Sequence, residues 1–171
     1  MATAERRARI EAADGDTPGN LVTIRDATLA DVETIAAIEK ASFANPWLPQ
    51  TFRSLVEQGR AYLPVAEDLE TGVIGYAVFW WALDQGELAN VAVRGDHQGR
   101  GIGAALLDRV IDHAREQGVE SLFLEVRVSN ESAHGLYLSR GFTQIAVRKG
   151  YYQKPREDAR ILVKQLNEDG A

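Results

Sequence analysis

A glycine-rich loop at residues 98–104, set between an apolar run and a helical pattern, is the feature that most constrains the fold. The preceding residues 87–93 have the composition of a strand, and residues 101–117 carry apolar side chains at helical spacing. A second apolar strand pattern follows at residues 122–128. Two strands joined by a helix of this length form a parallel pair with a right-handed crossover. The chain is therefore predicted to be an α/β protein.

Short connections between the other apolar runs favour antiparallel neighbours. Residues 84–86 are too few for a crossover and imply an antiparallel meander. The predicted strands span residues 21–26, 62–66, 73–82, 87–93, 122–128, 142–147 and 159–166. The predicted helices span residues 28–41, 49–57, 101–117 and 130–141, the last of them capped by either Ser129 or Asn130. We therefore expect a single-domain, mixed, mostly antiparallel sheet of about seven strands flanked by four helices.

The first twenty residues differ from the rest of the chain. They contain seven charged residues, no aromatic residue and no apolar block. Residues 1–20 are expected to form a flexible N-terminal extension, and residues 21–168 the folded domain. No run in the chain reaches the roughly 18 apolar residues of a membrane span, and no secretory signal is recognisable. We expect a cytoplasmic protein without a membrane partner.

The amino-acid composition excludes several kinds of site and partner. The chain has no cysteine, which excludes disulfides, thiolate metal ligands and a cysteine nucleophile. Its 19 basic and 25 acidic residues give a net charge of −6, which argues against direct nucleic-acid binding. His97, His113 and His134 lack the spacing of metal ligands, and His113 falls on the polar side of its helix. Neither a metal nor a nucleic acid is expected as a partner.

The loop at residues 98–104 is suited to anions. Glycines let the backbone approach a ligand closely, and unpaired amides at a helix start attract phosphate above all. The loop lacks the Lys-Ser/Thr ending of a P-loop and the dinucleotide pattern Gly-x-Gly-x-x-Gly. An ordinary glycine-rich turn is the alternative. The position between strand and helix, together with Arg100, favours a pyrophosphate cradle.

Two residues further along have side chains suited to proton transfer. Alternation places Glu125 among apolar neighbours in a strand, where partial desolvation raises a carboxyl pKa towards that of a general base. A surface carboxylate paired with Arg127 is an equally good interpretation. The phenol of Tyr137, with an ordinary pKa near 10, can protonate a leaving group at neutral pH. A ring that fills a gap between helix and sheet is the alternative for Tyr137.

Aromatic residues mark two further segments. Trp80 and Trp81 are neighbours in a predicted strand and must point to opposite faces, so core packing and a substrate-groove wall both remain open. Residues 148–160 combine basic side chains with two tyrosines. That segment is either a solvated hairpin or a peptide-binding loop with aromatic walls.

Several motifs occur together in a fixed order. They are Gln98-x-x-Gly101-x-Gly103-Ala104, the preceding Asn90-Val91-Ala92-Val93, and the later Asn130, Leu136-Tyr137 and Gly141-Phe142. With these motifs, residues 22–166 resemble the GNAT superfamily of acetyl-CoA-dependent N-acetyltransferases. A finer set comprises Pro46-Trp47, residues 124–130, residues 148–152 and Glu157-Asp158-Ala159. That set resembles the bacterial ribosomal-protein alanine N-acetyltransferases, which modify the N-terminal amine of a small-subunit ribosomal protein.

The resemblance implies a GNAT-like acyl-CoA N-acyltransferase fold with acetyl-CoA as co-substrate. The pantetheine arm would be bound by the backbone of Val91, Ala92 and Val93. The pyrophosphate would be held by the amides of Gly99, Arg100, Gly101, Ile102, Gly103 and Ala104. Asn130 would also contact the cofactor.

The resemblance also implies roles on the acceptor side. Glu125 would be the general base, through a water, and Tyr137 the general acid that protonates the CoA thiolate. The peptide groove would be lined by Trp47, Tyr151 and Tyr152. Without a cysteine, direct attack in a ternary complex is the natural route, and an α-amine with a pKa near 7.7–8.0 needs less help than a lysine near 10.4.

The leading hypothesis is therefore an enzyme, acting as a monomer or weak dimer, that acetylates the N-terminal α-amine of an alanine-initiated ribosomal protein. Lysine side chains or a small-molecule amine are alternative acceptors on the same fold. A non-catalytic acyl-CoA-binding module is a third hypothesis, which Glu125 and Tyr137 argue against.

Overall fold

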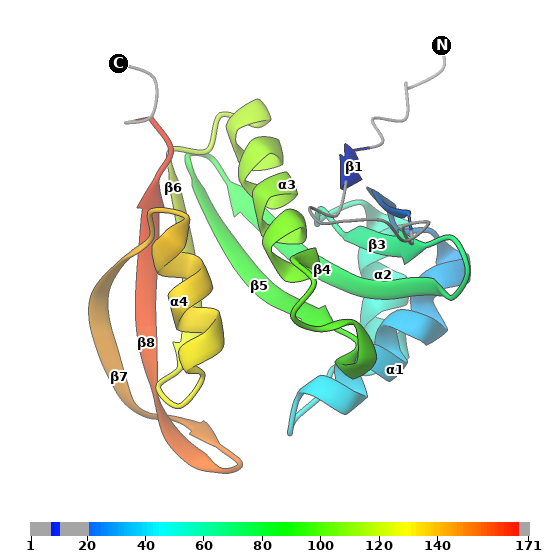
Figure 1. The fold of residues 1–171 in the computed structure, drawn as a ribbon. Helices are drawn as coiled ribbons and strands as arrows, with labels where there is room; N and C mark the ends of the chain where they lie inside the picture. The colour runs from blue at the N-terminus through cyan, green and yellow to red at the C-terminus, as the bar shows by residue number, and fades with distance from the viewer. Residues whose placement is uncertain (1–7, 11–20, 168–171) are drawn as a thin grey trace. The chain divides into compact units, whose positions relative to one another are not determined.

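The strands and helices follow one another in the predicted order, with one additional strand at the start (Figure 1). The computed structural model describes residues 8–10 and 21–167. Its strands are β1 (Ala8–Ile10), β2 (Val22–Asp26), β3 (Pro64–Asp68), β4 (Gly72–Ala82), β5 (Gln85–Val93), β6 (Ser121–Arg127), β7 (Thr143–Gln153) and β8 (Arg156–Gln165). Its helices are α1 (Val32–Ser42), α2 (Pro49–Gln58), α3 (Ile102–Glu116) and α4 (Glu131–Ser139), with short 3₁₀ turns at η1 (Leu29–Asp31) and η2 (Gly95–His97).

The strands hydrogen-bond in the order β1-β2-β3-β4-β5-β6-β8-β7. The parallel pair is β5 with β6, in which Gln85–Leu88 pair with Ser121–Leu124, and α3 is the crossover between these two strands. Antiparallel pairing joins β1 to β2, β2 to β3, β3 to β4, β6 to β8 and β7 to β8. The predicted mixed, mostly antiparallel α/β sheet with four helices is confirmed.

Strand β1 is additional to the seven predicted strands. It falls inside the predicted N-terminal extension and pairs with β2 through Ala8 and Ile24. The other residues of that extension, 1–7 and 11–20, lie outside the described residues, so the extension remains a prediction. None of the helices in residues 21–167 is long and apolar enough to cross a membrane.

The described chain forms two compact units. The first contains the described residues through Val78 together with Asn90–Val110, and the second contains Phe79–Ala89 and the described residues from Ile111 onward. Strands β4 and β5 and helix α3 each contribute residues to both.

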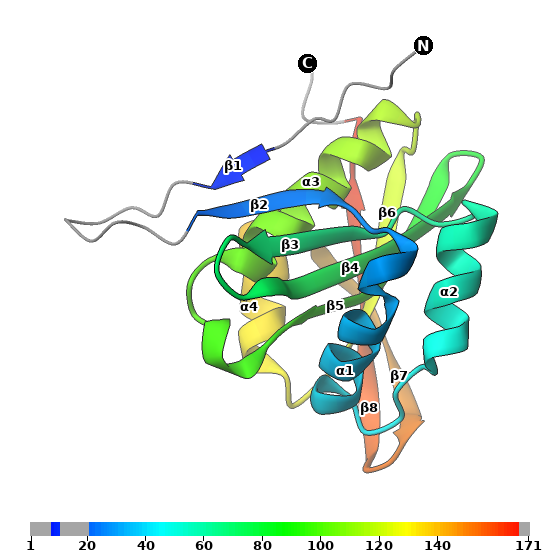
Figure 2. The same ribbon diagram turned by 90° about the vertical axis from the view of Figure 1, so that its right-hand side faces the viewer.

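The core of the first unit lies between its strands and its helices, with α1 and α2 on one face of β2, β3 and β4 (Figure 2). One face of α1 is buried because its apolar residues recur at helical spacing: Val32, Ile35, Ala36 and Ile38. Helix α2 begins with Pro49, where a missing N–H does no harm, and ends before Gly59, whose φ of 59° suits a left-handed cap. These signals fix the two ends of α2.

The second unit is organised by the alternation along β6. Leu122, Leu124 and Val126 are buried, whereas Phe123, Glu125 and Arg127 are partly exposed on the other face. The sequence leaves the cap of α4 open between Ser129 and Asn130, and the structure shows Asn130, whose Oδ1 accepts from the Ala133 amide at 3.1 Å.

Candidate active site

The predicted phosphate-binding loop follows η2 and opens α3 in the first unit. Gly99 and Gly101 adopt φ angles of 75° and 77°, in the left-handed region that favours glycine. No atom lies within 4 Å of the position that a Cβ would take at either residue, so conformation rather than space requires glycine there. The loop is exposed from Gln98 to Gly101, and the first amides of α3 have no partner within the helix. The arrangement suits a bound anion.

The segment before the loop is tied to β5 and β4. The Gln98 side chain donates to the Val93 carbonyl at 3.0 Å, and the Arg94 amide donates to the Ile74 carbonyl at 2.7 Å. His97 is buried, with its Nδ1 2.8 Å from Asp96. These contacts hold the loop against the end of the strand that is predicted to bind pantetheine.

A glycine in β4 sets the position of that strand. A Cβ on Gly75 would lie 3.0 Å from the Ala92 carbonyl oxygen and 3.2 Å from a Leu106 methyl group. The two strands approach so closely that a side chain does not fit without a shift. Ala92 is buried, and Val91 and Val93 beside it are partly exposed.

Sequence reasoning missed a buried carboxylate in the first unit. Glu39 is 1% exposed, and its carboxylate accepts hydrogen bonds from the Trp47 amide at 3.0 Å, the Asn90 side chain at 3.1 and 3.2 Å, and the Tyr76 hydroxyl. Burial and the Glu39 carboxylate raise the pKa of Tyr76 well above its usual range, so the phenol stays a donor. Glu39 could have been found in the sequence, because it is a charged residue on the otherwise apolar face of α1.

Trp47, predicted to line the peptide groove, is held through this carboxylate. Its backbone bonds to Glu39, and its ring packs against Phe52 with the ring centroids 5.8 Å apart. The indole is half-buried. The loop between α1 and α2 is thereby fixed at both its backbone and its side chain.

Glu125, the predicted base, lies in the second unit beside residues of β7. Its side chain is 23% exposed, and Arg148 Nη1 lies 3.5 Å from Oε1. The alternative interpretation, a pair between Glu125 and Arg127, is wrong. Arg127 instead pairs with Glu157 at 3.3 Å. It is held there because it also donates to two backbone carbonyls of the β7–β8 turn, at 3.0 and 3.1 Å.

Both tyrosines predicted to line the peptide groove gather around Glu125. The rings of Tyr151 and Tyr152 meet nearly at right angles, with centroids 5.1 Å apart. The hydrogen bond to Glu125, together with burial, raises the pKa of Tyr151 to about 12. Burial and the Glu125 charge also raise the pKa of Tyr152, whose ring lies under the Arg127 guanidinium at 4.0 Å. Residues 148–152 therefore form an aromatic and basic wall.

Tyr137, the predicted acid, lies on α4 with its ring edge-on to Phe142 at 5.7 Å. Burial, with a contribution from Tyr152, raises the pKa of Tyr137 to about 12. The two interpretations of this tyrosine are compatible, since the ring packs against Phe142 while the hydroxyl keeps its proton at neutral pH. The second unit thus contains both a carboxylate, Glu125, and a protonated phenol, Tyr137.

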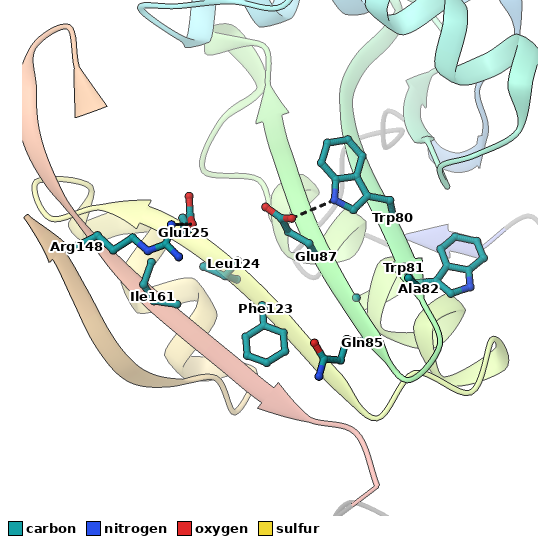
Figure 3. A pocket seen from close by; sticks show the side chains of 11 residues that line it. Trp80, Trp81, Ala82, Gln85, Glu87, Phe123, Leu124, Glu125, Arg148 and Ile161 are labelled. Carbon is teal, nitrogen blue, oxygen red and sulfur yellow. Dashed lines mark hydrogen bonds and ion pairs between the residues drawn. The ribbon is translucent and has the colours of Figure 1, made fainter. Parts of the chain in front are cut away.

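A pocket of about 570 Å³ opens on the face of the second unit that carries Glu125 (Figure 3). It is lined by Trp80, Trp81, Ala82, Gln85, Gly86, Glu87, Phe123, Leu124, Glu125, Arg148 and Ile161. The Trp80 indole N–H donates to Glu87 Oε2 at 3.1 Å. Sequence reasoning missed Glu87 as a site residue and named Arg148 only as part of the candidate peptide-binding segment 148–160.

The paired tryptophans point to opposite faces, as alternation predicts. The Trp81 ring stacks on Phe79 at 5.2 Å and meets His113 of α3 edge-on at 5.4 Å. His113 is therefore packed against aromatic rings rather than solvated, contrary to the expectation from its helical position. In residues 8–10 and 21–167, no group of three or more His, Asp or Glu side chains is arranged to hold a metal ion.

Residues 32–142 match the family model described as "Acetyltransferase (GNAT) family". The chain is 38% identical over 142 residues to the ribosomal protein bS18-alanine N-acetyltransferase of Escherichia coli K12, covering 82% of this chain and 95% of that protein. The crystal structure of the E. coli ribosomal-protein-S18-alanine N-acetyltransferase matches with a TM-score of 0.77 and 35% identity, covering 85% of this chain and 94% of the other. The structure of yncA from Salmonella typhimurium with its cofactor acetyl-CoA matches with a TM-score of 0.75 and 28% identity. The match covers 88% of this chain and 96% of the other.

Proposed function

The chain belongs to the acetyltransferase (GNAT) family, and we propose that it transfers the acetyl group of acetyl-CoA to the N-terminal α-amine of an alanine-initiated small-subunit ribosomal protein. As a member of that family it is an acyltransferase whose co-substrate is acetyl-CoA. Its similarity to enzymes named for alanine N-acetylation of ribosomal protein bS18 supports an N-terminal amine as the acceptor.

The observation that carries the proposal is the partly exposed Glu125 carboxylate in the lining of an open pocket, with Arg148 Nη1 3.5 Å away. A carboxylate in contact with both solvent and the acceptor pocket can take a proton from an amine through a water. An α-amine has a pKa near 7.7–8.0 and loses its proton readily at neutral pH, whereas a lysine near 10.4 does not. The site is suited to an N-terminal amine.

The proposed reaction is a direct transfer. The neutral amine attacks the thioester carbonyl carbon, so that a C–N bond forms and the C–S bond breaks. The amine proton passes to Glu125 through a water, and Tyr137 gives its proton to the departing thiolate. The raised pKa of Tyr137 keeps that proton in place before the attack. A chain without cysteine has no thiol to carry an acyl intermediate.

We assign the binding of acetyl-CoA to the glycine-rich loop, to the end of β5 and to Asn130. The exposed amides of residues 99–104 would hold the pyrophosphate at the start of α3. The backbone of Val91, Ala92 and Val93 would pair with the amides of the pantetheine arm as an added strand does. Asn130, at the N-cap of α4, would supply a further polar contact.

Mass spectrometry of an alanine-initiated peptide incubated with the enzyme and acetyl-CoA tests the proposal. The peptide should gain about 42 daltons at its N-terminus. Two controls are the same peptide with a blocked N-terminus and an internal lysine, and a free small amine. Faster acetylation of either control would overturn the N-terminal assignment in favour of the other acceptors. No release of CoA thiol with any acceptor would favour a non-catalytic acyl-CoA-binding module.

A further inference from the structure

Glu87 lies close to Glu125 on the same face of the second unit. Glu87 of β5 is the register partner of Phe123 on β6, and Glu125 follows two residues later on β6. Neighbouring strands are about 5 Å apart, and residues i and i+2 of a strand are about 7 Å apart. The two carboxylates therefore stand within the reach of two or three residues of extended peptide, which rises about 3.4 Å per residue.

The two carboxylates differ in their partners. Glu125 is paired with Arg148, whose Nη1 lies 3.5 Å from Oε1. Glu87 is exposed, and the contact found for its carboxylate within the described part of the chain is the hydrogen bond from Trp80 to Oε2 (Figure 3). That bond aims the carboxylate along the pocket without neutralising its charge.

The walls beside Glu87 are apolar. Phe123 of β6 pairs in register with Glu87, Trp80 lies on β4 on the other side of Glu87, and Ile161 lies on β8 opposite Glu125; all three line the pocket. A long cationic side chain fits such a place well, because its methylene stem covers apolar surface while its charged end meets an acid or an aromatic face. A neutral side chain would gain the stem contacts but leave Glu87 uncompensated.

We propose that Glu87, oriented by Trp80, forms a subsite for the cationic side chain of a Lys or Arg at the second position of the acceptor. The inference rests on the proposed function, since it places the acceptor amine at Glu125. The first residue then lies at the base, and the side chain of the second residue lies over Phe123 and reaches Glu87.

Initial-rate kinetics with three alanine-initiated peptides test this subsite. The peptides differ at the second residue alone, which is Arg, norleucine or Glu. Wild-type enzyme should show a KM lowest for the Arg peptide, about fivefold below that for norleucine, with kcat unchanged. Glu87→Gln should raise KM for the Arg peptide and leave the norleucine peptide as it was. Glu87→Lys should reverse the preference in favour of the Glu peptide.

Two controls separate a subsite from general attraction to a chain of net charge −6. Glu120→Gln removes the same charge from an exposed position just before β6 and should leave the preference intact. Moving the Arg to the sixth residue of the peptide, beyond the reach of Glu87, should abolish the preference. A preference that persists with Arg at position six, or that survives Glu87→Gln, overturns the subsite. Acetylation of the norleucine peptide tests the proposed function by itself, so the two failures are distinguishable, and no acetylation of any peptide overturns both.

Discussion

The buried carboxylate of Glu39 accepts a hydrogen bond from the backbone amide of Trp47 at 3.0 Å. Trp47 stands eight residues further on, beyond the end of α1, in the loop that leads to α2. A helix residue thus holds a loop by its backbone, and two more donors, Tyr76 and Asn90, converge on the same carboxylate. Four segments of the first unit meet at one side chain.

Replacing Glu39 by Gln should lower the free energy of unfolding by about 2 kcal/mol. The new amide group brings two donor hydrogens to a place where three donors already converge, so at least one buried group loses its partner. Urea denaturation at neutral pH measures the change. Glu33→Gln, on the exposed side of α1, is the matched control and should shift the free energy by less than about 0.5 kcal/mol. Equal losses in the two variants would mean that the buried network contributes nothing specific.

Glu125→Gln and Tyr137→Phe should each lower kcat by about 100-fold or more, because each removes one proton-transfer group. Acetyl-CoA affinity, measured by calorimetry, should stay within about twofold of wild type. Release of free thiol from acetyl-CoA reports kcat. Full activity in both variants would refute the assigned roles.

The raised pKa of Tyr137 predicts how kcat depends on pH. A phenol with a pKa near 12 keeps its proton through pH 10, whereas an ordinary phenol is half ionised there. With saturating substrates, kcat should reach a plateau once the amine is deprotonated and hold it up to about pH 10. Circular dichroism at each pH should accompany the assay to show that the enzyme remains folded. A fall to half the plateau rate near pH 10, in folded protein, would contradict the role given to Tyr137.

Gly99→Ala and Gly101→Ala should weaken acetyl-CoA binding by strain alone. Each position has a positive φ and open space for a methyl group, so the substitution costs about 1 kcal/mol of backbone energy without a clash. The expected result is a KM for acetyl-CoA raised about fivefold, with kcat at saturation unchanged. Gly95→Ala is the control, since Gly95 lies in the preceding turn, with open space and no positive φ. An equal rise in KM for Gly95→Ala would show that the loop responds to any added side chain.

Asn130 has two roles that substitutions can separate. Asn130→Ala removes the cap of α4 and should lower the free energy of unfolding by about 1 kcal/mol. Asn130→Asp keeps a capping oxygen, so the stability should survive while a negative charge replaces the amide donor assigned to the cofactor. Thermal unfolding and the KM for acetyl-CoA, measured on both variants, distinguish the roles. If Asp binds acetyl-CoA as well as Asn does, the cofactor contact is wrong and the cap is the role that remains.

Short-range sequence patterns were enough to predict the structure of those parts of the site whose residues are close together in the chain. The loop at residues 98–104 was predictable because glycines and the start of an amphipathic helix are adjacent in sequence. The opposite orientations of Trp80 and Trp81 follow from strand alternation alone. The sequence narrows the N-cap of α4 to Ser129 or Asn130, and the hydrogen bond from the Ala133 amide identifies Asn130 as the cap.

Partners brought together by distant pairing were not predictable. Glu125 meets Arg148 and Tyr151 because β7 pairs with β8 in a register that shifts twice, once between Arg148 and Tyr152. Those shifts depend on the whole hairpin, which extends β7 to Gln153, six residues beyond its predicted end. Glu39 likewise finds Tyr76 and Asn90 at separations of 37 and 51 residues. No short-range pattern contains such information.

A side chain at position 75 would act on the strand that is assigned to pantetheine. The missing side chain of Gly75 sets the spacing between β4 and the carbonyl of Ala92, next to the backbone groups assigned to pantetheine. A single added methyl group would move that carbonyl by a few tenths of an ångström while touching none of the reacting atoms. We therefore expect Gly75→Ala to change the affinity for acetyl-CoA through these backbone groups without altering the chemical step.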